Sequence, residues 1–168
     1  MIQASDGNLW GIWENGGGGD GSVIVMSPAS GAVVRSFSFN GTNGARPGAS
    51  VVQGADGKLY GTATAGGSVA NGNVAMGTVW SLDAGLPAPM AAIAAFTPSS
   101  GAVGSKVTIR GNHFIGTKAV AFNGVSATFK VLNVNFITAI VPAGATTGTI
   151  AVTNAGGTRT SNSKFTVP

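Results

Sequence analysis

The 168-residue chain contains no cysteine and little charge. Without cysteine it can form no disulfide, no thiolate nucleophile and no Cys-ligated metal site. Charged residues make up 8% of the sequence, against roughly 25% in ordinary globular proteins. The single histidine, His113, has no second imidazole to complete a usual zinc site, and the sequence offers no orienting partner that would make it a general base. The sequence therefore predicts no metal and no cofactor.

Long hydrophobic runs and basic clusters are also missing. The longest apolar stretch, around residues 90–96, is much shorter than the ~20 residues of a membrane-spanning helix. No basic-then-apolar signal peptide opens the chain. The nine basic residues give a net charge of +4 but are scattered along the sequence. Because nucleic-acid binding needs concentrated phosphate contacts, this scatter argues against a nucleic-acid partner.

Glycine and strand-forming residues dominate what is present. The chain has 28 glycines, and 43% of its residues are apolar, which is enough to bury a core and excludes a disordered chain. No window shows a helical period with caps. Residues 33–39 alternate apolar and polar side chains with the period of two that is typical of strands. We therefore predict an all-β fold.

An internal repeat occupies the first half of the chain. Residues 2–11 match residues 52–61 at an offset of 50, and residues 21–26 correspond to residues 77–82, so the second copy is about six residues longer. A period of this size is typical of four-stranded propeller blades. Asp6-Gly7 and Asp56-Gly57 predict two-residue type I′ hairpins. The chain opens in what reads as the middle of a repeat, so we expect sequence upstream of it.

The order Phe39, Gly44-Ala45-Arg46-Pro47, residues 56–62, Gly66-Gly67 and residues 77–80 resembles the GloVer repeat. That resemblance covers roughly residues 1–85 and implies a bacterial, often exported, protein with tandem copies. Fewer than two complete copies are present here, which predicts a partial β-propeller-like region with unpaired strand edges. Because chains relieve such edges by pairing them, we predict a homo-oligomer that self-associates through the N-terminal repeats.

The second half of the chain reads as a sandwich. Prolines 87 and 89 mark a linker, because proline removes ladder donors. Short strands then follow at about ten-residue spacing, with an Asn123-Gly124 turn, which is typical of a β-sandwich. The predicted domains are two repeats in residues 1–86, a Pro-rich linker in residues 87–90, and a sandwich in residues 91–168.

Residues 98–114 carry the pattern P-x-S-G-x-x-G-x-x-V-T-I-x-G-x-x-F. With residues 141–148 and 165–167, this pattern closely resembles an IPT/TIG domain. The resemblance implies an immunoglobulin-like β-sandwich and, in bacteria, a spacer or adhesive module of a secreted or cell-surface protein. Because eukaryotic relatives contact DNA, weak DNA binding through this basic domain is one alternative function.

Carboxylates offer a second alternative. Asp6 and Asp56 occupy equivalent turns, where side-chain to backbone bonding explains them. Glu14 and Asp20 flank a four-glycine loop and have no acidic counterparts in the second repeat. A pair of carboxylates can hydrolyse a glycoside, so these two are the candidate catalytic residues if the chain is a glycoside hydrolase.

Four aromatic residues are candidates for ligand binding: Trp10, Trp13, Tyr60 and Trp80. Aromatic rings supply large contact areas to sugar rings at low entropic cost. Trp10 and Tyr60 share a repeat position, which also fits a core role. Trp13 has no aromatic counterpart, since Ala63 stands there, and is the best candidate for exposed binding. We predict a noncatalytic binding or structural module, directed to a polysaccharide or cell-surface glycan.

Overall fold

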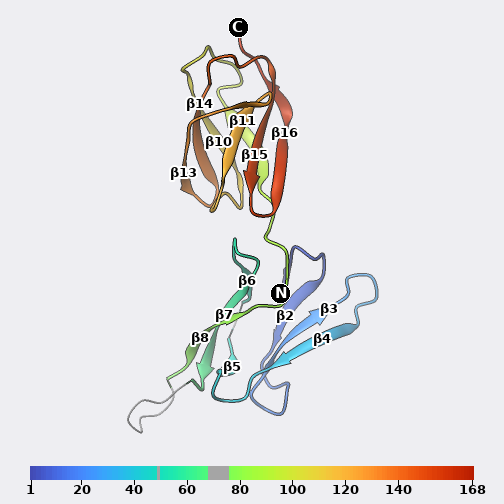
Figure 1. Ribbon diagram of the computed structural model, residues 1–168. Coiled ribbons are helices and arrows are strands. Elements are labelled where there is room, and N and C mark those ends of the chain that lie inside the picture. The colour runs from blue at the N-terminus through green and yellow to red at the C-terminus, as the bar shows by residue number, and fades with distance from the viewer. Residues whose placement is uncertain (49, 68–75) are drawn as a thin grey trace. The chain divides into compact units, whose positions relative to one another are not determined.

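The computed structural model describes residues 1–48, 50–67 and 76–168. These residues form sixteen strands and no helix, so the predicted all-β fold is confirmed (Figure 1). None of the described segments forms a helix that could cross a membrane. The chain divides into two compact units, Met1–Pro87 and Ala88–Pro168. Most of the extra length of the second repeat lies outside the described residues.

The first sheet of the N-terminal unit is a four-stranded antiparallel meander. Its strands follow one another in space as they do in sequence: β1 (Ile2–Gln3), β2 (Leu9–Trp13), β3 (Ser22–Met26) and β4 (Val33–Ser38). Sequential antiparallel order is the arrangement of a propeller blade. β4 is an edge strand, and its Val33 and Val34 are both 53% exposed.

The second sheet also has four strands, but they are arranged differently. Its strands are β5 (Ala45–Pro47), β6 (Val52–Gln53), β7 (Leu59–Ala65) and β8 (Thr78–Leu82). β8 lies on one side of β7, while β5 and β6 share the other side. Val52 pairs with Tyr60 in the register that joins Ile2 to Trp10. Among the described residues, β8 has no outer neighbour equivalent to β4.

The two sheets bury a common core. Its fully buried members include Trp10, Val25, Val51 and Leu59, and Trp80 is only 7% exposed. The core takes side chains from one face of each sheet, because successive residues of a strand point to opposite faces. The other face of each sheet lies outside this core.

The predicted type I′ hairpins at Asp-Gly are wrong. Type I′ needs a positive φ at both central residues, but only Gly7 and Gly57 have one (82° and 86°). The Gly7 amide instead donates to Ala4 O at 2.9 Å, which makes Asp6 the third residue of a four-residue turn. The sequence signal missed this because the Asp6 carboxylate accepts from the Asn8 amide at 3.0 Å and closes a longer, five-residue connection.

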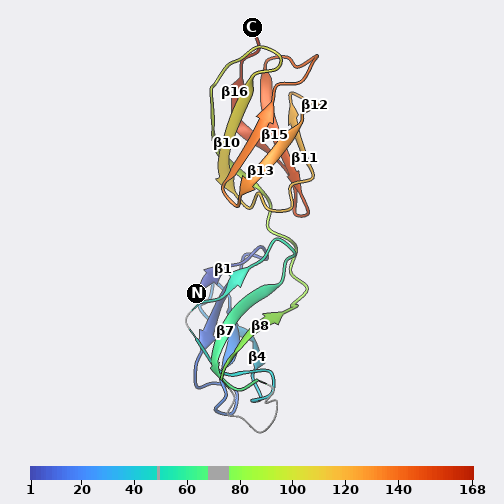
Figure 2. The ribbon, with the colours of Figure 1, turned by 90° about the vertical axis from the view of Figure 1, so that its left-hand side faces the viewer.

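The C-terminal unit is a sandwich of two four-stranded sheets (Figure 2). One sheet has the order β13-β14-β10-β9 and the other has the order β12-β11-β15-β16. The strands are β9 (Ala92–Thr97), β10 (Lys106–Asn112), β11 (Ala119–Phe122), β12 (Val125–Ser126), β13 (Phe129–Asn133), β14 (Phe136–Ile140), β15 (Gly148–Asn154) and β16 (Gly157–Phe165). Every second residue of β15 is buried, as expected of a strand with one face in the core.

Local signals in this unit are confirmed. Asn123 and Gly124 both have positive φ (44° and 87°) and connect β11 to β12, as a type I′ turn requires. The core holds Val107, Ile109, Phe114, Ile137 and Ile150, all at 0% exposure. The unit therefore has a complete core of its own.

Candidate functional site

Each repeat contains the same link between a turn carboxylate and an aromatic ring. In the first, the Trp10 Nε1 donates to the Asp6 carboxylate at 3.2 and 3.3 Å. In the second, the Tyr60 hydroxyl donates to Asp56 Oδ2 at 2.6 Å. These carboxylates are engaged in holding the turns, which leaves them little freedom to act on a substrate.

These hydrogen bonds shift pKa values. Burial raises the pKa of Asp6, but hydrogen bonds from Asn8 and Trp10 outweigh burial and leave this pKa below its ordinary 3.8. The Tyr60 hydroxyl, which favours the ionised carboxylate, is the main cause of the lowered pKa of Asp56. The same bond raises the pKa of Tyr60. These pKa shifts keep both aspartates ionised and Tyr60 protonated at neutral pH, so the two hydrogen bonds persist there.

Trp10 and Trp80 are core residues. Trp10 is 1% exposed and stacks on Phe37, with ring centroids 5.8 Å apart. Trp80 meets Phe39 edge to face at 5.5 Å, and its buried Nε1 has no partner among the described residues. Tyr60 is half-buried. Of the four candidate aromatic residues, only Trp13 presents most of its ring to solvent.

Trp13 lies at the end of β2, and its side chain is 58% exposed. A Cβ on Gly16 would lie only 2.8 Å from Trp13 Cδ2 and 2.9 Å from Cε3. The ring therefore lies against the backbone of Gly16, because a side chain at this position would collide with it. This contact supports one side of the indole and leaves an aromatic surface for a planar or ring-shaped ligand.

Glu14 and Asp20 flank the same loop. Glu14 is exposed and Asp20 is half-buried, and the Asp20 carbonyl accepts from the Arg46 amide at 2.8 Å. Within the described ranges, no hydrogen bond or ion pair joins the two carboxylates to each other, and no group of three or more His, Asp or Glu could hold a metal ion. Glu14 follows Trp13 directly in the chain, whereas Asp20 Oδ2 lies 4.0 Å from the position that a Cβ on Gly41 would occupy.

A groove of about 300 Å³ lies between the outer strands of the two sheets of the N-terminal unit. Phe37 and Phe39 line one side, Trp80 and Leu82 line the other, and Asn43 adds an amide. The sequence did not predict this groove, because its two sides come from segments that are far apart in the chain. An apolar cleft with few polar groups is typical of small-ligand sites.

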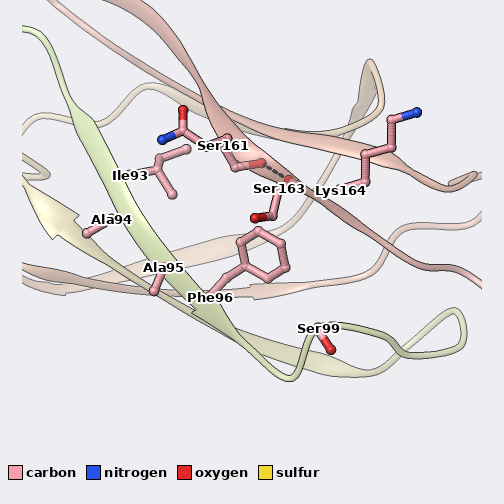
Figure 3. Close-up of a pocket in the computed structure, with 9 residues that line it drawn as sticks. Ile93, Ala94, Ala95, Phe96, Ser99, Ser161, Ser163 and Lys164 are labelled. Carbon is pink, nitrogen blue, oxygen red and sulfur yellow. Dashed lines mark hydrogen bonds between the residues drawn. The ribbon is translucent and has the colours of Figure 1, made fainter.

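The C-terminal unit has a crevice of about 210 Å³ between the edge strands β9 and β16 (Figure 3). Phe96 and Ile93 line it from β9, and Ser161 and Ser163 line it from β16. Both strands are irregular here: β9 shifts register at Ala94, and the Ser161 hydroxyl accepts from the Ile150 amide at 3.0 Å in place of a ladder carbonyl. Both irregularities lie in the pairing of these edge strands with their inner neighbours, β10 and β15.

Comparison with known proteins identifies the C-terminal unit. Residues 91–167 match the family model described as IPT/TIG domain, which confirms the resemblance seen in residues 98–114. This unit is an IPT/TIG immunoglobulin-like domain. No curated protein matches the chain, and the resemblance of residues 1–85 to GloVer repeats stays a prediction.

Several solved structures are similar to part of the chain. A putative phosphatase from Bacteroides thetaiotaomicron is 30% identical over 49% of this chain and 19% of its own, with a TM-score of 0.44. An auxiliary nutrient binding protein from the same organism is 20% identical over 49% and 22%, also at 0.44. A structure with xylogluco-oligosaccharide is 19% identical over 86% and 36%, at 0.47. The chain thus spans about a fifth of the two Bacteroides proteins, and at TM-scores below 0.5 we draw no function from these likenesses.

Proposed function

We propose that the chain is a noncatalytic, carbohydrate-directed binding module of a bacterial extracellular or cell-surface protein. The observation that carries the proposal is Trp13, whose ring is 58% exposed and rests on the backbone of Gly16. The extracellular setting rests on the resemblance of the N-terminal half to GloVer repeats and on the IPT/TIG domain.

The chemistry of the Trp13 loop fits a sugar better than a charged ligand. A ring supported on one side loses little conformational freedom when a ligand stacks on it. The exposed Glu14 carboxylate supplies acceptors for hydroxyl groups, and the Gly17 and Gly18 amides supply donors, because the amides of Gly16, Gly19 and Gly21 already donate within the loop. The loop contains no cation, which disfavours phosphate or nucleic acid as the ligand.

A noncatalytic role is supported by the state of the carboxylates. Asp6 and Asp56 accept hydrogen bonds within their turns, and Asp83 is paired with Lys58 at 3.8 Å. Glu14 and Asp20 are the two that remain, and neither has an orienting partner among the described residues. Acid–base catalysis needs a positioned and tuned pair.

The test is a binding screen of the full chain against neutral polysaccharides by affinity electrophoresis. We expect Trp13→Ala to weaken binding at least tenfold, because the stacking surface is lost, and Trp13→Phe to retain part of it. Val33→Ala, which trims an exposed apolar residue on another strand, is the matched control and should bind as the parent does. Equal retention by the parent and Trp13→Ala, or retention by no polysaccharide, would contradict the proposal. Cleavage that vanishes in Glu14→Gln would establish a hydrolase instead.

A further inference from the structure

The two units of the chain differ in charge. All five acidic residues lie in residues 1–87, whereas six of the nine basic residues lie in residues 88–168. The C-terminal unit is therefore positively charged, and it contains no carboxylate side chain that could neutralise its basic groups. A surface of one sign attracts ligands of the other sign. The unit is thus suited to an anionic ligand, provided that its basic groups lie together.

The sheet register brings three of these basic residues onto one face. Residues of β10 alternate between exposed and buried, which places Lys106, Thr108 and Arg110 on the outer side of the sheet that contains β10, β13 and β14 (Figure 1). Thr108 pairs with Thr138, and Thr138 pairs with Lys130, so both share this side. We call the surface that these five residues form the Arg110 face.

The three basic groups of the Arg110 face are spread out rather than clustered. Lys106 and Arg110 are four residues apart on one strand, which is about 13 Å. Lys130 lies two strands away from Thr108, which is about 10 Å. The three basic side chains are exposed, and no ion pair engages them among the described residues. An extended polyanion can meet all three at once, which a single small anion cannot.

A hollow of about 570 Å³ adjoins Arg110 on this side of the sheet, and Asn112, Asn135 and Phe136 also line it. The Asn135 Nδ2 donates to Asn112 Oδ1 at 2.7 Å and to Gly111 O at 2.9 Å, which holds the Asn112 amide and leaves its Nδ2 as a donor. Phe136 is half-buried and pairs with Arg110. The hollow therefore combines a guanidinium group, an amide donor and an aromatic ring.

We propose that the Arg110 face binds an acidic polysaccharide, with one carboxylate-bearing sugar in the hollow beside Arg110. A guanidinium group presents two parallel N–H donors that match the two oxygens of a carboxylate. The Asn112 amide donates to a sugar hydroxyl, and the Phe136 ring offers an apolar contact to the sugar ring. Lys106 and Lys130 attract further carboxylates of the same polymer. This site contains no part of the Trp13 loop and does not depend on it.

The same face fits a nucleic acid less well. Proteins that bind single strands stack successive bases on several aromatic rings, whereas Phe136 is the only ring among the outward residues of β10 and β14, which the structure describes in full. Proteins that read a duplex insert a helix or a two-stranded ribbon into its major groove. A flat sheet face with threonine hydroxyls between its cations instead fits a polymer rich in hydroxyl groups.

The test is titration of the full chain with polygalacturonate, with the fully methyl-esterified polymer as the uncharged counterpart. The parent should bind polygalacturonate, more weakly as salt is added because salt screens the attraction, and should not bind the ester. Arg110→Ala should weaken binding at least tenfold. Arg110→Lys should fall between the two, because lysine keeps the charge but loses the paired donors.

The matched control is Arg159→Ala, which removes the same charge from an exposed position on β16, in the other sheet, and should bind within twofold of the parent. Trp13→Ala should also bind polygalacturonate as the parent does, so a failure of the Trp13 proposal is seen separately. Equal weakening by Arg110→Ala and Arg159→Ala overturns the inference, because net charge alone then explains binding. So does a parent that ignores polygalacturonate, binds its ester equally well, or binds duplex DNA more tightly.

Discussion

The two repeats share a backbone and a turn, yet they differ in which face is buried. Trp10 and Tyr60 occupy equivalent positions and each bonds to the aspartate of its own turn, but Trp10 is 1% exposed and Tyr60 is half-buried. The difference follows from packing: the side of the first sheet that carries Trp10 lies in the common core, whereas the side of the second sheet that carries Tyr60 lies outside that core as far as the structure describes it. In repeated folds, stability resides in contacts between units as well as in each unit.

The largest expected difference between the repeats lies at this aromatic position. Trp10→Ala removes a fully buried ring that stacks on Phe37 and should cost about 4 kcal/mol of unfolding free energy. Tyr60→Ala removes a half-buried ring from an open face and should cost about 1 kcal/mol. Urea unfolding followed by tryptophan fluorescence measures both, because all three tryptophans lie in the N-terminal unit. Equal losses would show that the two faces are equally covered.

A matched pair of glycines sharpens the comparison. A Cβ on Gly61 would overlap the ring of Trp80, whereas a Cβ on Gly11 would meet only Met1 Cε, at 3.3 Å. Gly61→Ala should therefore cost about 2 kcal/mol through overpacking, while Gly11→Ala should change stability by less than about 0.5 kcal/mol because the long Met1 side chain can move. The same urea titration tests both, and a Gly11→Ala loss as large as that of Gly61→Ala would show that Met1 cannot move aside.

The smallest expected effect comes from the turn aspartate, which both repeats contain. Both turn aspartates have pKa values lowered in the folded chain, so the unfolded chain takes up protons first as the pH falls. Their contribution to stability is present above the ordinary value of 3.8 and is lost as the pH falls through the lowered values. We expect the thermal midpoint of the N-terminal unit to drop over this acidic range, and Asp6→Asn with Asp56→Asn to flatten that drop. An unchanged pH profile in the double variant would remove the turn carboxylates as its cause.

The sequence predicted the strands more accurately than it predicted which of their side chains are buried. The 50-residue offset predicted the matching pairs of strands, because equivalent residues such as Gln3 and Gln53 mark the repeat directly in the sequence. It left the burial of Trp10 and Tyr60 open, because both have the same neighbours in sequence and differ only in what packs on them. The Asp-Gly turns were misjudged because the Asp6 side chain competes with the backbone for the turn hydrogen bonds. Neither the groove of the N-terminal unit nor the crevice between β9 and β16 could be predicted from a sequence motif, because each is bounded by strands far apart in the chain.

The irregular edges of the IPT/TIG domain bear on how such a chain stays in solution. With 8% charged residues, repulsion between copies is weak, and charge gives little protection against one strand adding to another. The register shift at Ala94 lies in the pairing of β9 with β10, and the bond of Ile150 to the Ser161 hydroxyl lies in the pairing of β15 with β16. An irregularity of this kind increases the local twist of its strand, and a twisted edge strand is one of the devices by which sheets discourage edge-to-edge pairing when charge is scarce.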